Sequence, residues 1–221
     1  MISDPLKVAA EGNNIDGLYQ EIQQDPRVLE SIDSIPFVET PLHVAASLGH
    51  FEFATEIMTL KPSLAVKLNP EGFTPINLAL QCNHDKMVLH LVEMNKDLVR
   101  VKGSEGFTPL HFASQQSKTE LLDKFLKACP DSIEDVTTRS ETALHIAVKH
   151  RRYVTLKVLF RWLMTNSRKD SQGSYIGAIA SNNRIWKYPN TKIYSSRQDI
   201  LLGQCYCTSL ASMVQVRYEV P

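Results

Sequence analysis

Thr40-Pro41-Leu42-His43 is the first of four related phrases in this 221-residue chain. The others are Thr74-Pro75-Ile76-Asn77, Thr108-Pro109-Leu110-His111 and Thr142-Ala143-Leu144-His145, and each starts 34 residues after the one before. A strict period of about 20 to 50 residues indicates a solenoid built from one supersecondary unit. Such units stack because none of them can bury its apolar face alone, so the period predicts a continuous core along the array.

The residues around the first phrase predict a pair of helices in each repeat. Thr40 stands at an N-cap position, where its hydroxyl can accept from an unpaired helix N–H. Pro41 follows at the first helical position, where no N–H is needed. Gly49 ends this first helix, and a second helix is expected over 51–60. The same pattern predicts helices over 73–80, 86–94, 107–114, 119–128, 141–148 and 153–163.

A less regular unit precedes the first phrase. Residues 4–13 match a first helix with Lys7 in the place of His43, and residues 15–23 supply a second helix. A terminal repeat is expected to be atypical because its outer face meets water. The predicted repeats are 2–35, 36–69, 70–103, 104–137 and 138–164, within one domain over 1–164. Residues 165–221 are divergent, with strand-like runs at Lys192–Ser195 and Ser212–Val220, and we expect this tail to be poorly ordered.

The loops between repeats are expected to be hairpin-like turns. Gly72 and Gly106 stand two residues before a threonine, where a tight turn with positive φ suits glycine. Val38 and Ser140 hold the corresponding positions, so we predict looser first and last turns. After the second helices, a proline or a short polar stretch is expected to stop the helix, with the next aliphatic residue tucked under the turn.

The composition is that of an ordinary soluble globular protein, with 43% hydrophobic and 22% charged residues. Lys+Arg and Asp+Glu balance at 24 each, so nucleic acid is not an expected partner. Four scattered cysteines without a CxxC pair suit a reducing compartment. Neither a signal peptide nor an apolar run of 18 or more residues is apparent, which predicts a cytoplasmic location.

The recurring phrase is close to the T-P-L-H-x-A signature of ankyrin repeats. The predicted fold class is therefore an all-α ankyrin-repeat solenoid, made of helix-turn-helix repeats with β-hairpin-like loops. The chain has no P-loop, no GxSxG phrase and no kinase signature. We therefore expect a binding module rather than an enzyme, and we expect no cofactor.

Three histidines invite a metal-binding or catalytic interpretation: His43, His111 and His145. Each belongs to the first helix of its own repeat, and packed helices lie about 8–10 Å apart. Zinc ligands must lie within about 2 Å of the ion, so these side chains are badly placed to share one. A hydrogen bond from each histidine to the threonine of a neighbouring turn is the favoured interpretation, and no metal site is predicted.

Longer phrases point to one group of ankyrin proteins. Ile35-Pro36-Phe37-Val38-Glu39-Thr40-Pro41-Leu42-His43, Lys61-Pro62-Ser63-Leu64-Ala65 and Ala128-Cys129-Pro130 resemble plant ankyrin-repeat proteins of the accelerated-cell-death and bian-da type. Those proteins end in a multi-pass membrane domain called PGG. The resemblance covers the five repeats and implies membrane-associated signalling in defence and cell death through protein contacts. The chain diverges near Met164–Ser171 and has no Pro-Gly-Gly element, which predicts truncation before the membrane domain.

The leading functional prediction is a non-catalytic protein–protein interaction scaffold in plant defence and cell-death signal transduction. One alternative is a membrane-associated signalling protein whose PGG domain is missing from this chain. Another is a soluble decoy isoform of such a protein. The expected partners are other proteins, including full-length ankyrin relatives, and the resemblance implies association with the plasma membrane.

Ankyrin arrays bind partners through their hairpin tips and the exposed side of their first helices, and the resemblance carries these sites over by position. The tips supply Phe37, Glu39, Glu71, Phe73, Glu105, Phe107, Arg139 and Glu141. The first helices supply Ser47, Leu48, Gln81, Cys82, Gln115, Gln116, Lys149 and His150. Aromatic side chains beside carboxylates suit a binding surface, although Phe73 and Phe107 could instead pack on neighbouring turns. The tips run from acidic to basic along the chain, which favours a partner with the opposite gradient.

The last predicted helix pair is basic. Residues 149 to 169 hold no acid and seven cations, which are Lys149, Arg151, Arg152, Lys157, Arg161, Arg168 and Lys169. One interpretation is a solvated helix pair. The other is a patch of Arg151, Arg152, Lys157 and Arg161 for anionic lipid headgroups or an acidic partner, which would give a peripheral membrane contact. Apolar residues on the last helix lack a following repeat and are expected to form an exposed patch unless something covers them: Val154, Leu156, Leu159, Phe160 and Leu163.

Overall fold

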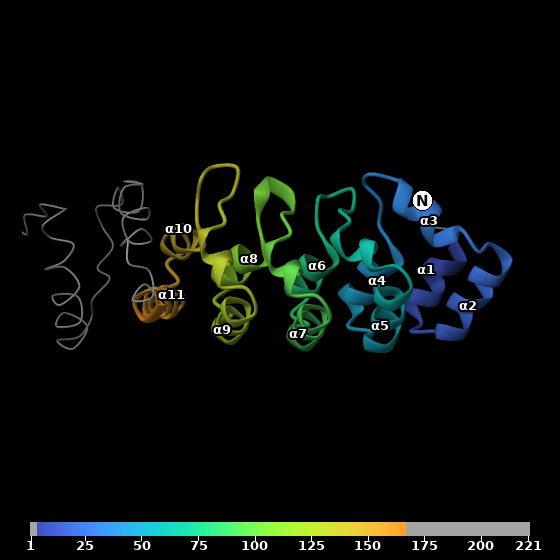
Figure 1. Cartoon of the computed structure of the whole chain (residues 1–221), viewed down its shortest axis with the longest axis horizontal. Helices are drawn as coiled ribbons and strands as arrows, with labels where there is room; N and C mark the ends of the chain where they lie inside the picture. The colour runs from blue at the N-terminus through green and yellow to red at the C-terminus, as the bar shows by residue number, and fades with distance from the viewer. Residues whose placement is uncertain (1–3, 167–221) are drawn as a thin grey trace, which may run out of the picture. The chain divides into compact units, whose positions relative to one another are not determined.

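A computed structural model of the protein describes residues 4–166, all within one compact unit (Figure 1). Helices follow one another in pairs along this part of the chain. The first helices of the pairs are α1 (Asp4–Glu11), α4 (Pro41–Leu48), α6 (Pro75–Gln81), α8 (Pro109–Gln116) and α10 (Ala143–Lys149). The second helices are α2 (Ile15–Gln24), α5 (Phe51–Leu60), α7 (Asp85–Met94), α9 (Thr119–Ala128) and α11 (Tyr153–Asn166).

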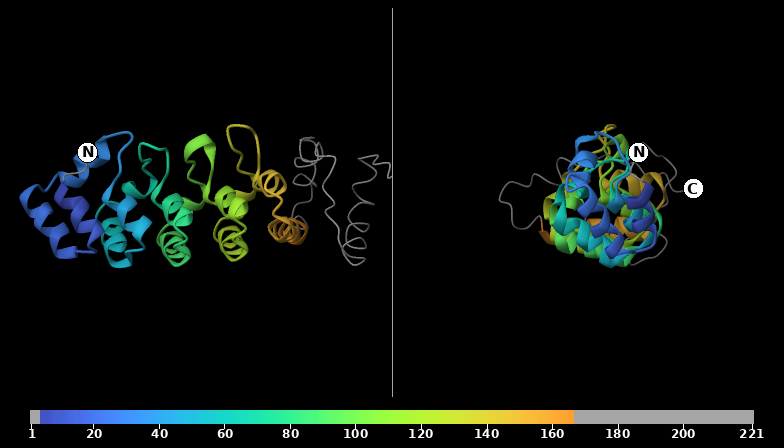
Figure 2. Two further views of the ribbon diagram at one scale, coloured as in Figure 1. Left: turned by 180° about the vertical axis from the view of Figure 1, so that it is seen from behind. Right: turned by 90° about the vertical axis from the view of Figure 1, so that its right-hand side faces the viewer.

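Neighbouring pairs pack first helix on first helix and second helix on second helix. Contacts run from α1 through α4, α6 and α8 to α10, and from α2 through α5, α7 and α9 to α11. Figures 1 and 2 show loops, first helices and second helices as three tiers. Between residues 4 and 166 no strand forms, apart from an isolated bridge between Phe37 and Leu68. These features confirm the predicted all-α repeat solenoid.

Small residues let the first helices approach one another. Ala45, Ala79, Ala113 and Ala147 recur at one position of the repeat, and each is fully buried. The apolar residue of each phrase is also fully buried, and burying such a side chain contributes about 1.5–3 kcal/mol. These residues are Leu42, Ile76, Leu110 and Leu144. The repeating phrase therefore supplies both the close helix contacts and the continuous core.

The ends of the first helices follow the predicted capping. The Thr40 hydroxyl accepts from the backbone N–H of His43 (3.3 Å), and the Thr74 hydroxyl accepts from that of Asn77 (3.4 Å). The first helices after α4 begin two residues later than the predicted ranges, because the threonine is the N-cap and lies outside the helix. The second helices α5 and α9 have the predicted bounds.

The second helices α5, α7 and α9 are each followed by a short turn that returns the chain. This turn is a 3₁₀ helix in three repeats, η1 (Pro62–Val66), η2 (Lys96–Arg100) and η4 (Pro130–Glu134). Leu64, Leu98 and Ile133 are buried there, as predicted for the aliphatic residue after the stop. The first repeat has a helix at this place, α3 (Val28–Ser34), which the sequence pattern did not predict. It forms because Val28, Leu29 and Ile32 lie on one helical face and are buried together.

The last helix buries much of the apolar face that we expected to be bare. Leu156, Leu159 and Leu163 are buried, since α11 packs against both α9 and α10. Phe160 is half-buried, and only Val154 of the five is largely exposed, at 63%. Most of this apolar face is therefore covered, and exposure remains at Val154 and in part at Phe160. The predictions for residues beyond 166, including the tail, its strand-like runs, Arg168 and Lys169, lie outside the described residues.

Candidate protein-binding surface

The loops before the first helices form four fingers, over residues 35–39, 67–73, 101–107 and 135–141. The last three are closed by the same backbone hydrogen bond, from Asn69 N to Phe73 O (2.9 Å), Gly103 N to Phe107 O (2.8 Å) and Thr137 N to Glu141 O (3.0 Å). A short 3₁₀ turn, η3 (Ser104–Gly106), lies in the third finger. The closing bond fixes the shape of each tip.

The tips turn through a left-handed residue. Its φ is +81° at Gly72, +73° at Gly106 and +59° at Ser140. The expectation of a looser last turn was therefore wrong, because Ser140 accepts the same conformation despite its side chain. The first finger does differ, since Val38 is buried and donates from its backbone to Leu68 O (3.0 Å).

Backbone hydrogen bonds also join the fingers to one another. Ser104 N donates to Gly72 O (2.6 Å), and Thr138 N donates to Glu105 O (2.9 Å). A Cβ on Gly106 would lie 2.9 Å from Thr138 N, so glycine is needed for this close approach. The tips of the last three fingers are therefore held in one row.

His43 links its own helix to the next finger. Its Nδ1 accepts from the backbone N–H of Thr40 (3.0 Å) and lies 2.8 Å from the Thr40 hydroxyl. Since Nδ1 is an acceptor, the ring proton is on Nε2, which donates to the carbonyl oxygen of Phe73 (3.0 Å). The predicted bond to a threonine exists, but it is made within the repeat because Thr40 lies one helical turn before His43. The neighbouring turn contributes a carbonyl instead.

His111 repeats this arrangement. Its Nδ1 lies 2.8 Å from the Thr108 hydroxyl, and its Nε2 lies 3.1 Å from the carbonyl oxygen of Glu141. Burial lowers the pKa of both His43 and His111 to about 4, because the imidazolium form would lose its hydration, while the bonds to the backbone carbonyls oppose this shift. Both rings are therefore neutral near pH 7 and serve as links between repeats.

Asn77 occupies the same position in the third repeat but makes no such link. Its side chain is fully buried, and both its Oδ1 and its Nδ2 lack a hydrogen-bond partner. A Cβ on Gly103 would lie 2.7 Å from Asn77 Nδ2, so Gly103 leaves the room for this amide. The shorter side chain leaves the third and fourth repeats without the histidine bridge.

Three aromatic rings meet between two fingers and a first helix. Phe112 of α8 lies 6.1 Å from Phe73 and 5.3 Å from Phe107, measured between ring centroids, with interplanar angles of 61° and 56°. Phe73 and Phe107 remain half-exposed, whereas Phe112 is almost buried. Phe73 and Phe107 therefore pack against a neighbouring ring and are still partly exposed to solvent. Phe112 was not among the predicted site residues, although an apolar residue follows the histidine position in every phrase.

The residues that were predicted to form the binding surface differ in their exposure to solvent. Those that are exposed are Phe37, Glu39, Leu48, Glu71, Gln81, Cys82, Glu105, Arg139, Lys149 and His150. Those that are half-buried are Ser47, Phe73, Phe107, Gln115, Gln116 and Glu141. None of them is fully buried, so all remain candidates for contact with a partner.

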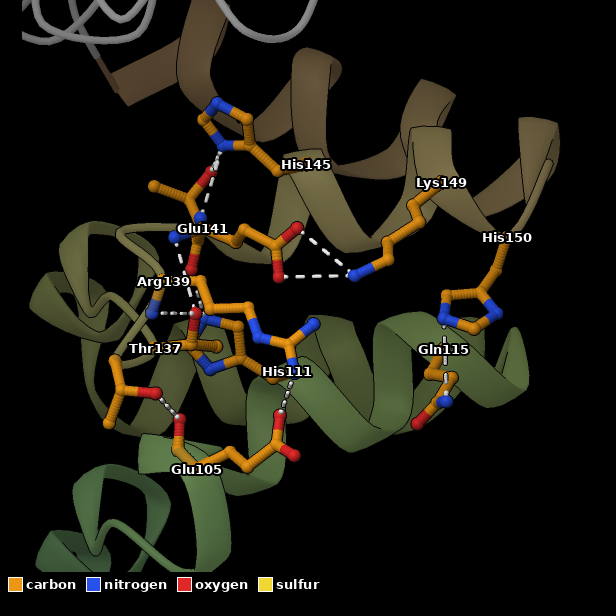
Figure 3. A network of polar contacts seen from close by, with 11 residues as sticks. Glu105, His111, Gln115, Thr137, Arg139, Glu141, His145, Lys149 and His150 are labelled. Carbon is orange, nitrogen blue, oxygen red and sulfur yellow. Dashed lines mark hydrogen bonds and ion pairs between the residues drawn. The ribbon is translucent and has the colours of Figure 1, made fainter.

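Polar contacts connect the late part of this surface (Figure 3). Arg139 lies 3.4 Å from the Glu105 carboxylate on the neighbouring finger, and Lys149 lies 3.1 Å from that of Glu141. Gln115 Nε2 lies 3.4 Å from His150 Nε2. Lys7 and Glu39 are 4.0 Å apart at the other end. These pairs offset much of the acidic-to-basic gradient that the sequence predicts along the tips.

The predicted basic patch is exposed on the last helix pair. Arg151, Arg152, Lys157 and Arg161 all lie at the surface. Arg152 also donates from Nε to the carbonyl oxygen of Gln115 (2.8 Å), so part of its side chain holds two repeats together. Between residues 4 and 166 no group of three or more His, Cys, Asp or Glu side chains is placed to hold a metal ion. No helix in that range combines the length and apolar character needed to cross a bilayer.

The fold and the finger surface define residues 4–166 as an array of ankyrin repeats, and such repeats are typically non-catalytic modules that bind other proteins. Residues 6–102 match the family described as ankyrin repeats (three copies). The chain is similar to ankyrin repeat-containing protein BDA1 of Arabidopsis thaliana, with 43% identity over 67 residues. This likeness covers 30% of the chain and 16% of the Arabidopsis protein, so the chain spans only a small part of that relative.

Proposed function

We propose that this protein is a non-catalytic scaffold, which binds other proteins across its fingers and first helices during plant defence and cell-death signalling. The observation that carries the proposal is the bonding between fingers, from Ser104 N to Gly72 O and from Thr138 N to Glu105 O. Because these bonds already order the tips, less conformational entropy is lost when a partner binds. The defence role is supported by the resemblance to plant ankyrin proteins and by the likeness to the Arabidopsis relative.

A second proposal concerns where the scaffold acts. The exposed cations Arg151, Arg152, Lys157 and Arg161 support a peripheral contact with an anionic membrane. Association with longer ankyrin relatives that carry a membrane domain would bring the protein to the same place. Replacing Arg151, Lys157 and Arg161 by glutamate should abolish sedimentation with phosphatidylserine vesicles if the patch acts directly, and unchanged sedimentation would contradict a role for the patch.

The scaffold proposal is tested by recovering partners from plant cells with the tagged full chain. A finger variant combines Glu71→Lys, Glu105→Lys and Arg139→Glu, and a control carries Glu93→Lys on the exposed side of α7. The wild type and the control should recover the same proteins, and the finger variant should lose them. Equal recovery by all three proteins would show that the fingers are not the binding surface.

A further inference from the structure

The aromatic rings of Phe73, Phe107 and Phe112 form the central apolar part of the finger surface. Two of the rings come from adjacent fingers and one from α8, so the group spans two consecutive repeats. We infer that this aromatic cluster receives an apolar side chain of a partner segment in which lysine or arginine stands next to that anchor. The inference rests on the proposed scaffold function and adds the chemistry of the partner.

The charges beside the aromatic cluster are acidic. Glu71 and Glu105 each precede a phenylalanine of the cluster by two residues, in the repeated order Glu-Gly-Phe. Both carboxylates are exposed. Glu105 has Arg139 at 3.4 Å, but both side chains are more than half exposed, and such surface pairs contribute little. Within the described part of the chain, no ion pair is formed by Glu71.

Ion pairs bracket the aromatic cluster on both sides. The residue directly before the threonine of each phrase is, in chain order, Glu39, Phe73, Phe107 and Glu141. The two phenylalanines therefore have a glutamate at the same position of the repeat on either side. Glu39 faces Lys7 at 4.0 Å, and Glu141 faces Lys149 at 3.1 Å. Of the two outer carboxylates, Glu141 has the shorter and less exposed ion pair, whereas the pair of Glu39 is long and exposed to solvent. Beside the cluster, Glu71 forms no ion pair among the described residues and Glu105 has only the exposed pair with Arg139, which is why a basic residue next to the apolar anchor complements this surface best.

Amide side chains near the ends of the first helices suit the backbone of a bound segment. Gln81 is exposed at the end of α6, and Gln115 is half-exposed at the end of α8. Each amide can both donate and accept, as the peptide groups of an extended segment require. An apolar centre with a polar rim is the usual anatomy of a protein interface.

The test uses a display library of random peptides selected on the full 221-residue protein. Enriched peptides should share an aromatic or aliphatic residue with Lys or Arg beside it. The most enriched peptide is then synthesised with a fluorescent label, and its affinity is measured by anisotropy. Glu71→Lys with Glu105→Lys should weaken binding by about tenfold or more, and Phe73→Ala should do the same. The control Glu93→Lys, which makes the same type of charge change outside the surface, should leave affinity unchanged.

Each outcome bears on the inference. Enriched peptides without a basic residue beside the anchor would overturn it, and so would affinity that survives the double glutamate variant. A selection that enriches no peptide would also overturn it, since the cluster would then bind no simple apolar anchor. The recovery of partners from plant cells tests the scaffold function separately. If a partner is recovered by the wild type and the control but not by the finger variant, the scaffold function is supported even if this inference fails. Circular dichroism checks that Phe73→Ala is folded. The variant Glu71→Lys with Glu105→Lys changes only exposed side chains, so it tests the inference even if Phe73→Ala does not fold.

Discussion

His43 Nε2 lies 3.0 Å from the carbonyl oxygen of Phe73, and so one imidazole ties the first helix of a repeat to the finger of the next. His111 makes the same bond to Glu141 at 3.1 Å. In a solenoid, stability depends on such contacts between neighbouring repeats. The position between these two histidines along the array holds Asn77, whose amide atoms are buried without partners.

Asn77→His should stabilise the protein by about 1 kcal/mol. The imidazole would satisfy the cap at Thr74 and reach the third finger, as His43 and His111 do at their positions. Urea unfolding monitored by circular dichroism measures the change. The reverse substitution, His111→Asn, should destabilise by about 2 kcal/mol because it removes the bridge between repeats. If Asn77→His proved as destabilising as His111→Asn, the bridging role would be wrong.

Stability should fall as the pH is lowered from about 6.5 towards 4. The folded-state pKa of His43 and of His111 is about 4, below the ordinary value of 6.5, so the unfolded chain binds more protons in this window. The contribution of these neutral histidines to the free energy of unfolding is therefore complete above pH 6.5. It is lost as the pH approaches 4, by roughly 3 kcal/mol per histidine. Urea midpoints across this range measure it. His111→Asn should have a shallower pH dependence than the wild type, and an identical slope would contradict the assignment.

Ser140→Gly should stabilise the protein by about 1 kcal/mol. Ser140 has a φ of +59°, at the position where Gly72 and Gly106 accept the left-handed conformation without strain from a side chain. The matched control is Gly106→Ala, which should destabilise by about 1–3 kcal/mol because its Cβ would lie 2.9 Å from Thr138 N. Thermal unfolding by calorimetry distinguishes the two, and a loss of stability in Ser140→Gly would count against strain at this turn.

Arg100→Ala should destabilise by about 1–2 kcal/mol. Arg100 donates from Nε (3.0 Å) and Nη2 (2.6 Å) to Asp135, whose carboxylate is 8% exposed and would be left without this partner. The same pairing raises the pKa of the guanidinium. As a control, Lys127→Ala removes the exposed pair with Asp123 and should change stability by less than about 0.5 kcal/mol. Equal effects of the two substitutions in urea unfolding would refute the distinction.

Much of the fold could be predicted because each repeat follows local rules. The bounds of α5 and α9 follow from the turn residues that flank them, and Thr40 caps α4 through a contact only three residues long. The missed helix α3 shows the limit of this approach. Val28, Leu29 and Ile32 form a helix in a place where the other repeats form 3₁₀ turns, because packing on the core selects between two conformations that are locally similar.

The candidate surface was predictable by position but not in its chemistry. The sequence indicated which fingers carry Glu71, Phe73, Glu105 and Phe107. It did not indicate that Phe112 joins the two phenylalanines, because its contact with Phe73 is made between two different repeats.

By itself, the sequence determined the repeat, its helix pairs and the alternation of finger and helix, since these depend on capping, glycine conformation and apolar spacing within one repeat. The tertiary structure alone decided which charges are offset and which remain free. Glu141 meets Lys149 and Glu105 meets Arg139 because the array brings these side chains together. Glu71 carries the same charge in the same position of its repeat and is left facing solvent. Coulomb energy depends on distance, and only the folded array sets the distances between repeats.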